Sequence, residues 1–432
     1  MVSALEARLL SHLDVHQPRL VEILTELVRR PSENRAPAGA ESACQEYAAG
    51  VLSGAGWEPV LYSPRDVPGL TEHPLYWPGR DYQGRPNLMA RRTGRGGGRS
   101  LVLSGHADTV PAGSQPWTRD PFGAEICGTH LYGRGSNDMK GGFATNLFVA
   151  ETLAALDIEL NGDLVIESVV DEEFGGVNGT LAGRLVGANG DAAVISEPSF
   201  LRICPAQRGG RTVHLTFRAP NAGILCETPE EAGVVQQLRR FLEGLSEFSR
   251  GRHASLAVHP YYAHLADPAP VTVTGISTGP WGTGEPTCTP AVCRVALFWQ
   301  TMPGEKLEDI DAGFQAWFEQ LLAAWPETFR MRPLMEYPIR WLPGSALDPE
   351  APLIREFSTC AARALGHAPP VQGIEGPCDM YVFHHFGIPA ILWGGRGGNT
   401  HGPDEYVELD SLAAAARALL LFVCRWCGVH SN

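Results

Sequence analysis

Apolar residues recur at two different spacings along the first half of the chain. Some segments repeat Leu, Ile, Val or Ala every three or four residues, which predicts helices, whereas others are short and almost wholly apolar, which predicts buried strands. The two kinds of segment alternate, as is typical of α/β layering. The predicted helices lie at 1–30, 41–52, 142–156 and near Leu181, and the predicted strands lie near Pro59 and Leu88 and at 101–104, 164–170 and 192–196.

The pattern changes in the middle of the chain and then returns. Strands are predicted at 211–217, 271–276 and 292–298, with amphipathic helices at 229–248 and 306–324. Beyond Arg330 the first pattern resumes, with helices at 352–365 and from Leu409 and a strand at 388–393. The sequence therefore predicts a discontinuous α/β domain at 1–205 and 328–432, with three layers around a mostly parallel sheet. A smaller α+β domain at 206–327 is inserted into it.

Two stretches follow neither period. The segment from Ser63 to Arg85 is rich in Pro, Gly and aromatic residues, which indicates an ordered surface loop or an insertion. The Gly-rich run from Gly94 to Gly98 lacks the Lys-Ser/Thr pair and the helix that would follow in a phosphate loop. We therefore interpret it as a turn between two strands.

The composition excludes two classes of partner. The chain has 432 residues, of which 44% are hydrophobic, and this is enough for more than one packed core. A formal charge of −14 argues against nucleic acid, because binding to phosphates depends on clustered Lys and Arg. The apolar stretch 412–427 is too short for a membrane span and contains Arg417 and Arg425. We expect a soluble protein without nucleic-acid or membrane partners.

The cysteines indicate a compartment rather than a site. Ten cysteines in 432 residues are too few for a disulfide scaffold, so a reducing cytoplasm is expected. Cys424 and Cys427 form a C-x-x-C pair inside a predicted terminal helix, without a second pair or a nearby His. We interpret them as packing residues.

Polar side chains stand where apolar runs end. The strand at 101–104 leads to His106 and Asp108, and a metal-bound His often donates its other ring N–H to such a carboxylate. In an α/β sheet, ligands bind at the carboxyl ends of the strands, so these side chains are expected to converge there. The other polar residues at such positions are Asp138, Glu172, Glu173, Glu197 and His401.

Each of these residues also has a simpler interpretation when taken alone. Asp138 is compatible with a helix cap, Glu197 with a strand-end carboxylate, and His401 with a surface loop. Adjacent carboxylates such as Glu172 and Glu173 beside a packed core are harder to explain, because like charges repel unless a cation compensates. Together the set supplies enough ligands for two metal ions that share a bridging carboxylate.

The motifs around these residues resemble, in order, those of the family of dinuclear zinc hydrolases that contains acetylornithine deacetylase, succinyl-diaminopimelate desuccinylase, aminoacylase and glutamate carboxypeptidase. The resemblance covers nearly the whole chain, and five ordered motifs are far more specific than any one of them. The motifs are Gly-His106-x-Asp108-x-Val-Pro, Gly-Arg-Gly-x-x-Asp138-Met-Lys-Gly-Gly, Asp171-Glu-Glu-x-Gly-Gly, Ser-Glu197-Pro and Thr-His401-x-Pro-Asp-Glu-Tyr-Val.

The resemblance implies a role for each residue. Asp138 would bridge two divalent ions, with His106 and Glu197 completing one site and Glu173 and His401 the other. The ions would be Zn²⁺, with Co²⁺ or Mn²⁺ as alternatives. Glu172 would act as general base and Asp108 would support the catalytic centre. The domain at 1–205 and 328–432 would be catalytic, and the inserted domain would be a lid through which a homodimer forms.

The inserted domain departs from the family pattern. Leu225 stands where the family has a His that reaches the tetrahedral intermediate, Thr287 replaces an Asn, and Gln300 replaces an Arg. A leucine cannot donate to an oxyanion, and losing one such donor costs on the order of 3 kcal/mol in other enzymes. Arg208, Gly394 and Gly395 remain candidates for holding a substrate carboxylate, with a structural salt bridge and a turn as alternatives for Arg208 and Gly395.

Three functional hypotheses follow from the sequence. The first is a zinc-dependent amidohydrolase that deacylates an N-acylated amino acid or a related small molecule by activating a water. The second is a carboxypeptidase or dipeptidase that acts on a short peptide at the same centre. The third is a metal-binding relative with little turnover, because the lid His is absent at Leu225.

Overall fold

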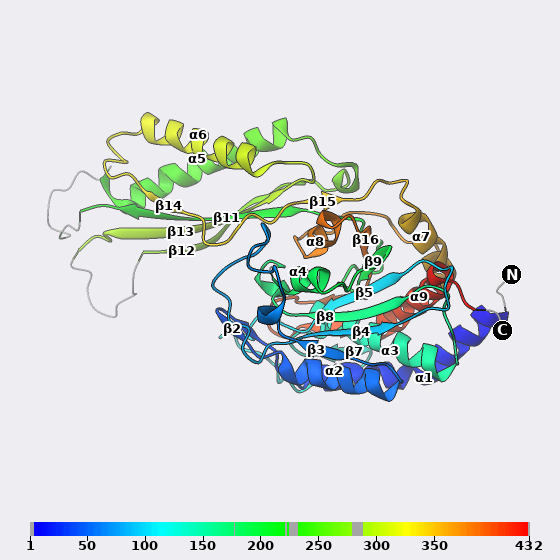
Figure 1. Cartoon of the computed structure of the whole chain (residues 1–432). Helices are drawn as coiled ribbons and strands as arrows, with labels where there is room; N and C mark the ends of the chain where they lie inside the picture. Colours follow the sequence, from blue (N-terminus) through cyan, green and yellow to red (C-terminus); the bar gives the residue numbers. More distant parts are fainter. Residues whose placement is uncertain (1–3, 177, 221–222, 224–231, 279–287, 431–432) are drawn as a thin grey trace. The chain divides into compact units, whose positions relative to one another are not determined.

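The computed structural model describes residues 4–176, 178–220, 223, 232–278 and 288–430 (Figure 1). The chain forms two compact units. Unit 1 comprises 1–206, 346–374 and 378–432, and unit 2 comprises 207–345 and 375–377. The strands that carry the chain across the boundary, β10 (Ala206–Gln207) and β15 (Ser345–Ala346), pair with each other.

Unit 1 is built on a six-stranded sheet with the order β16-β9-β5-β8-β4-β3. Strands β16, β9, β5 and β8 are parallel neighbours, whereas β4 runs antiparallel to both β8 and β3. The mostly parallel sheet expected from the sequence is confirmed. The strands are β3 (Val60–Tyr62), β4 (Asn87–Arg92), β5 (Leu101–His106), β8 (Leu164–Val169), β9 (Ala192–Ile195) and β16 (Ala390–Leu392).

Helices cover both faces of this sheet, which confirms the three-layer prediction (Figure 1). One layer contains α1 (Ala4–Val28), α2 (Ser42–Gly54), α3 (Gly141–Ala155) and α9 (Leu409–Cys427), and α7 (Pro352–Leu365) packs on α9. The other contains α4 (Asn178–Leu185) and α8 (Met380–His385). Strands β5 and β8 are buried along their full lengths because both of their faces are covered.

A small sheet that the sequence did not predict lies in the same unit. Its order is β17-β18-β7-β6, and its strands are β6 (Glu125–Cys127), β7 (His130–Tyr132), β17 (Gly397–Gly398) and β18 (Tyr406–Glu408). Strand β18 pairs antiparallel with β7, which brings the loop after residue 398 close to the turn that follows Tyr132. A two-stranded ribbon, β1 (Asn34–Arg35) with β2 (Ala38–Gly39), completes the unit.

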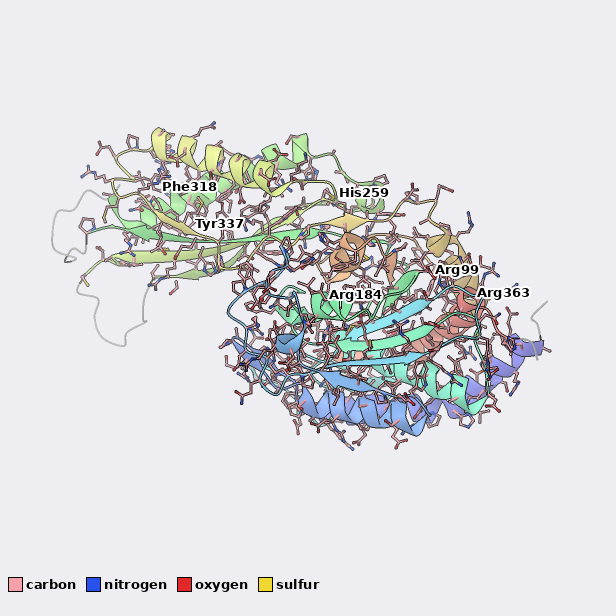
Figure 2. All side chains as sticks on the ribbon, in the orientation of Figure 1. Arg99, Arg184, His259, Phe318, Tyr337 and Arg363 are labelled. Atoms are coloured by element: carbon pink, nitrogen blue, oxygen red, sulfur yellow. The ribbon has the colours of Figure 1, made fainter. Side chains whose placement is uncertain are left out.

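Unit 2 consists of a four-stranded sheet covered by two helices. The sheet has the order β12-β13-β11-β14, with β11 (Gly209–Arg218), β12 (Val271–Ser277), β13 (Val292–Thr301) and β14 (Leu334–Glu336), and the helices are α5 (Val234–Ser255) and α6 (Leu307–Ala324). Aromatic side chains fill its core: Trp299 stacks on Phe314 with ring centroids 4.8 Å apart, and Phe318 is buried beside them (Figure 2).

Residues 328–345 lie in unit 2, although we expected them in the discontinuous α/β domain. The physical reason is that β14 pairs with β11 and extends the sheet of unit 2. This strand is too short for periodicity to reveal it. Among the described residues, no helix combines the length and the apolar character that a membrane span needs.

Candidate metal centre

The ends of three neighbouring parallel strands carry most of the candidate ligands. His106 is the last residue of β5, Glu172 and Glu173 follow β8 in a short 3-10 helix, and Glu197 follows β9. Because β9, β5 and β8 are adjacent and parallel, their carboxyl ends meet at one edge of the sheet. The convergence predicted from the sequence is therefore present in the structure.

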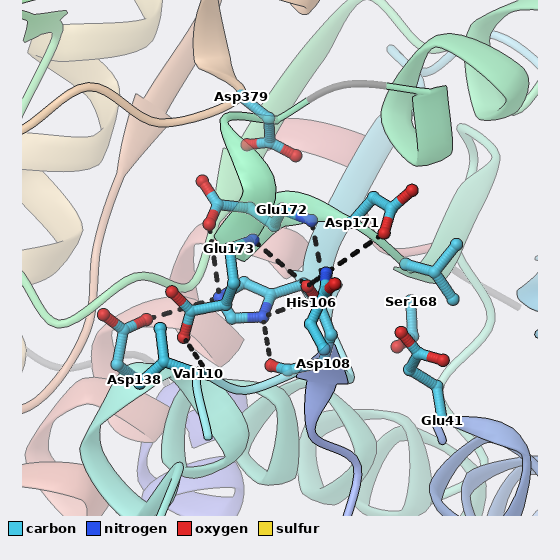
Figure 3. Close-up of polar contacts among 12 residues, drawn as sticks. Glu41, His106, Asp108, Val110, Asp138, Ser168, Asp171, Glu172, Glu173 and Asp379 are labelled. Atoms are coloured by element: carbon cyan, nitrogen blue, oxygen red, sulfur yellow. Dashed lines mark hydrogen bonds and ion pairs between the residues drawn. The ribbon is translucent and has the colours of Figure 1, made fainter. Parts of the chain in front are cut away.

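His106 is the centre of the cluster, and its side chain is 1% exposed. Its Nε2 atom lies 3.3 Å from Asp138 Oδ1, 3.5 Å from Glu197 Oε1 and 3.9 Å from Glu172 Oε2. The other ring nitrogen, Nδ1, lies 2.8 Å from the backbone oxygen of Asp108. Figure 3 shows the ring among the carboxylates. The ring thus turns Nε2 toward the acidic cluster.

The structure changes our account of how Asp108 supports this ring. We expected its carboxylate to accept the N–H of His106, but the carboxylate Oδ1 is 3.6 Å from Nδ1 and the backbone carbonyl is closer. The carboxylate instead accepts the backbone N–H groups of Glu172 and Glu173, at 3.3 and 3.1 Å (Figure 3). Asp108 therefore links the His106 strand to the turn that carries both glutamates.

Asp138 lies between two imidazoles. Its Oδ1 faces His106, and its Oδ2 is 3.3 Å from Nε2 of His401, which is also 3.0 Å from Glu173 Oε2. A carboxylate that presents one oxygen to each of two histidines has the arrangement that a bridging ligand requires. The helix-cap interpretation of Asp138 does not hold, because the residue that caps α3 is Lys140.

Burial and charge shift the pKa of every acid in the cluster. Burial first, and then neighbouring carboxylates, raise the pKa of Glu172 and of Glu197 well above the usual range. Burial opposes the ionised form of Asp138 as well, but hydrogen bonds from His106 and His401 lower the pKa of Asp138. The cluster contains more carboxyl groups than imidazoles, and bound cations would favour the ionised forms of these carboxyl groups.

The pKa of each histidine in the cluster is raised. Burial alone would lower the pKa of His106, yet the hydrogen bond to Asp138 and the charge of Glu197 raise it well above its usual value. In His401, burial is likewise outweighed by hydrogen bonds to Asp138 and Glu173, which raise its pKa to about 11. A metal ion at these histidines would compete with protons, because an imidazole must be deprotonated to bind a metal.

The donor atoms fit metal ions. The ligand atoms of His106, Glu172 and Glu197 lie within 4.8 Å of one another, and so do those of His106, Asp138 and Glu173. In the described part of the chain, Glu197 Oε1 is buried without a hydrogen-bond donor, and a positive ion would supply the missing partner. Imidazole nitrogens together with carboxylate oxygens suit zinc and related first-row ions.

The loop that carries His401 is fixed to the turn that carries Asp138. Arg134 pairs with Glu405 and donates at 3.1 Å to the carbonyl oxygens of His401 and Gly402. His401 has φ of 64°, a left-handed conformation that is uncommon for residues other than glycine. Such conformations persist where the surroundings enforce them, often at functional sites.

The residues proposed from the sequence for substrate binding have structural partners. Arg208, in unit 2, donates to the carbonyl oxygens of Pro268 and Glu375, each at 2.7 Å. Gly394 donates its backbone N–H to Ser199 Oγ at 3.0 Å, so this group is already engaged in the fold. A Cβ on Gly395 would lie 2.9 Å from Leu412, so close packing explains this glycine. Their role toward a substrate stays a prediction.

Three altered positions from the sequence can also be placed. Leu225 and Thr287 lie outside the described residues. Gln300 is the penultimate residue of β13, and its side chain donates to the carbonyl oxygen of Glu375 at 2.8 Å. Gln300 thus contributes a contact inside unit 2.

Sequence reasoning missed Asp379, which faces Glu172 in Figure 3. Asp379 is 1% exposed and accepts a hydrogen bond from Thr180, while its Oδ1 has no donor among the described residues. Its charge contributes to the raised pKa of Glu172, after burial. No motif could have singled out this residue, because it lies about two hundred positions from its neighbours in the site.

The chain is similar to known enzymes along nearly its whole length. The sequence pattern of Peptidase family M20/M25/M40 matches residues 102–425. The chain is 24% identical over 440 residues to N-formyl-4-amino-5-aminomethyl-2-methylpyrimidine deformylase of Halalkalibacterium halodurans, covering 97% of each. It is 26% identical over 415 residues to acetylornithine deacetylase of Salmonella typhimurium, covering 95% of this chain and 98% of that one.

Solved structures show the same fold. A dipeptidase of Saccharomyces cerevisiae matches with 15% identity and a TM-score of 0.76, covering 99% of each chain. A dinuclear metal binding peptidase of Bacillus subtilis matches with 16% identity and a TM-score of 0.61, covering 96% of this chain and 100% of that one. The chain belongs to Peptidase family M20/M25/M40. It is a metal-dependent hydrolase that acts on C–N bonds.

Proposed function

We propose that the cluster in unit 1 is a dimetal centre at which this chain hydrolyses the amide bond of a small N-acylated molecule. His106, Asp138 and Glu197 would hold one ion, and Asp138, Glu173 and His401 would hold the other. The observation that carries the assignment is the position of Asp138, which presents Oδ1 to His106 and Oδ2 to His401, each at 3.3 Å. We propose Zn²⁺ as the ion, with Co²⁺ or Mn²⁺ as alternatives, because the donors are nitrogen and oxygen.

Glu172 is our candidate for the general base. Bound divalent ions supply a lowered pKa for water and polarise the scissile carbonyl. Glu172 Oε2 belongs to the same cluster but is farther from His106 than the oxygens of Asp138 and Glu197. A carboxylate in this position takes the proton of the attacking water and then delivers it to the leaving amine nitrogen. Asp108 holds Glu172 in place through its backbone N–H.

The names of the relatives support a choice of substrate class. The two sequence relatives are named as a deformylase and a deacetylase, and both names describe the removal of an acyl group from nitrogen. Because the chain matches each over at least 95% of its own length, we favour deacylation of a small molecule such as an N-acylated amino acid. Hydrolysis of a dipeptide is the second candidate, supported by the likeness of the fold to a dipeptidase.

The test combines metal analysis with one substitution. We expect two divalent ions per chain in the wild-type protein and in Glu172→Gln, and a fall in kcat of about 10² to 10⁴ in Glu172→Gln. The matched control is Glu159→Gln, which removes an exposed carboxylate that pairs with Arg95 in unit 1. Full activity in Glu172→Gln, or a wild-type protein without bound metal, would refute the proposal.

A substrate panel separates the two candidates. N-formyl, N-acetyl, N-succinyl and N-carbamoyl amino acids would be compared with unmodified dipeptides by kcat/KM. Deacylation predicts that one acyl class exceeds every dipeptide, and peptidase activity predicts the reverse. Metal binding without turnover of any member would support the third hypothesis, which rests on Leu225.

We also propose that the protein is a cytoplasmic homodimer. The proposal of a dimer rests on the family resemblance of the inserted domain, and that of the cytoplasm on the sparse cysteines. Light scattering after gel filtration would measure the mass in solution. A mass equal to the 46.6 kDa of one chain would refute the dimer.

A further inference from the structure

The irregular segment that follows β3, residues 63–85, directs three side chains to one buried carboxylate. Asp171 is the residue between β8 and the turn that carries Glu172 and Glu173, and it is 0% exposed. Arg80 donates to Asp171 from Nε at 3.1 Å and from Nη2 at 2.5 Å. Arg85 adds a bond of 2.6 Å, and the hydroxyl of Tyr82 adds one of 2.7 Å. The segment is thus anchored beside the proposed metal ligands.

Further hydrogen bonds lead from Asp171 to the backbone of the turn that carries Glu172 and Glu173. Asn34 donates to Asp171 Oδ1 at 3.0 Å and to Asp108 Oδ2 at 2.8 Å, while its own amide oxygen accepts from Arg80. Asp108 in turn accepts the backbone N–H groups of Glu172 and Glu173. A continuous chain of hydrogen bonds therefore runs from Arg80 to the two glutamates of the site.

A second contact joins Arg80 to the residue that follows Glu172 and Glu173 in the sequence. The guanidinium carbon of Arg80 lies 4.3 Å from the ring centroid of Phe174, the residue directly after Glu173. An arginine over an aromatic face is attracted by the ring quadrupole, and the attraction is stronger away from water. Arg80 therefore contacts the turn at two points: at Asp171, directly before the two glutamates, and at Phe174, directly after them.

The negative charge of the buried aspartates explains why the residue at position 80 is an arginine. Asp171 and Asp108 are both 0% exposed and lie close to the acidic metal centre, so an unpaired charge here would be costly. The side chain of Arg80 is only 1% exposed. It therefore acts on the turn from within the protein and does not present its charge to a substrate in solvent.

We propose that Arg80 is a positioning residue of the metal centre, which fixes the turn 172–173 so that Glu173 can hold its ion and Glu172 can reach the attacking water. Replacing a residue that hydrogen-bonds to a metal ligand and orients it typically lowers metal affinity or activity by about 10-fold to 100-fold. The proposal rests on the proposed roles of Glu172 and Glu173. It assigns a function to the segment 63–85, which is otherwise an irregular connection between β3 and β4.

The principal test is Arg80→Met, which keeps much of the side-chain length and removes the charge and the donors. We expect kcat to fall about 10-fold to 100-fold with KM changed less than about threefold, because Arg80 acts through the turn. In the Co²⁺-loaded protein, without substrate, we expect an altered visible absorption spectrum. We also expect Co²⁺ affinity, measured by chelator competition, to fall about tenfold.

Two further variants separate positioning from general stability. Phe174→Leu removes only the stacking partner and should shift the Co²⁺ spectrum in the same direction by a smaller amount. Arg91→Met is the matched control, because Arg91 pairs with Asp163 at 2.9 Å in the same unit but lies near the end of β4, beside the start of β8 and away from the turn that follows β8. It should leave the spectrum and kcat unchanged. Arg80→Lys, which keeps one charged donor, should lie between wild type and Arg80→Met.

The outcomes are distinct. If folded Arg80→Met and Phe174→Leu keep the wild-type spectrum, Co²⁺ affinity and kcat, Arg80 is not a positioning residue, while the proposed function stands. If activity falls only in proportion to the unfolded fraction, with a wild-type spectrum in the folded protein, the proposal is equally overturned. A wild-type protein that binds no Co²⁺ would remove both the metal centre and the role of Arg80.

Discussion

The carboxylate of Glu405 accepts the backbone N–H of Asp138 at 3.0 Å, so a residue that binds no metal in our proposal holds the backbone of the proposed bridging ligand. Its two oxygens also accept the N–H groups of Asn137, at 3.1 Å, and Gly135, at 3.0 Å, and pair with Arg134. Glu405 lies in the loop that carries His401. One buried carboxylate therefore joins the segments that supply two of the ligands.

This relationship predicts the effect of Glu405→Gln. The amide keeps the shape but leaves Arg134 buried without its counterion, and breaking such a pair typically costs about 3 to 5 kcal/mol. It also replaces one acceptor of the Asp138 turn with a donor. We expect metal affinity to fall about 10-fold to 100-fold, measured by chelator competition on the folded protein.

Glu408→Gln, a substitution of a partly exposed glutamate in β18, is the control and should have little effect. Equal affinities in the two variants would contradict the prediction.

Removing the imidazole of His401 should halve the metal content of the protein. In His401→Ala, the ion that we propose at His106, Asp138 and Glu197 would keep its ligands, whereas the other would lose an imidazole that lies 3.0 Å from Glu173. We expect one tightly held ion per chain after dialysis, against two in the wild type, and a loss of kcat of at least about tenfold. Elemental analysis checks the count. Two retained ions would show that His401 is not a ligand.

Chelation should lower the stability of the protein at neutral pH. Without ions, the crowded carboxylates around Asp138 lose their compensating charge, and Glu197 Oε1 is left buried without a hydrogen-bond donor among the described residues. For ligand at 1,000 times its Kd, the stabilisation amounts to about 4 kcal/mol. Calorimetry with and without chelator should show a lower first unfolding transition, which added Zn²⁺ restores. An unchanged transition would argue against a metal-stabilised unit 1.

A histidine outside the metal centre predicts a pH effect on stability. Burial lowers the pKa of His384 to about 4 from its ordinary 6.5, while Nε2 makes contacts with Ala390. The unfolded chain therefore binds a proton more readily than the folded one between these values. The stability that neutral His384 contributes is full above pH 6.5 and is lost as the pH falls toward 4.

The size of this effect follows from the two pKa values. At pH 5 the wild type should have lost about 2 kcal/mol relative to a variant that does not titrate at this position. Thermal midpoints of the wild type and His384→Gln between pH 7 and pH 5 measure the difference. Parallel pH profiles in the two proteins would contradict it.

The fold was predictable where elements are long enough to repeat a pattern. The buried runs at 101–104 and 164–170 became β5 and β8, and most long helices were found within a few residues of their ends. The exception is α5, which was predicted at 229–248 and runs from Val234 to Ser255. Strand β14 and the strands of the sheet β17-β18-β7-β6 span only two or three residues, so they carry no readable period. Their pairing depends on partners that are distant in the chain. This is also why the boundary near residue 328 differs from the structure.

The candidate site likewise has a part that the sequence could predict and a part that it could not. The ligand types could be predicted because each stands at the end of an apolar strand or in an ordered motif. The supporting contacts could not, since they depend on how loops fold back: the carbonyl of Asp108, and not its carboxylate, lies nearest to His106 Nδ1. Arg80 and Asp379 have no motif of their own. Only the folded chain brings them to Asp171 and Glu172.

The three strands that lead to His106, Glu172 and Glu197 are interior members of the six-stranded sheet, and none of them is an edge. Local opening of a protein begins where backbone hydrogen bonds are least protected, as at the edge strands β16 and β3. Fraying at either edge leaves β9, β5 and β8 paired with one another. The ends of β5, β8 and β9 should therefore belong to the most slowly exchanging part of unit 1. Amide hydrogen exchange would place β5 in the last group of strands to exchange.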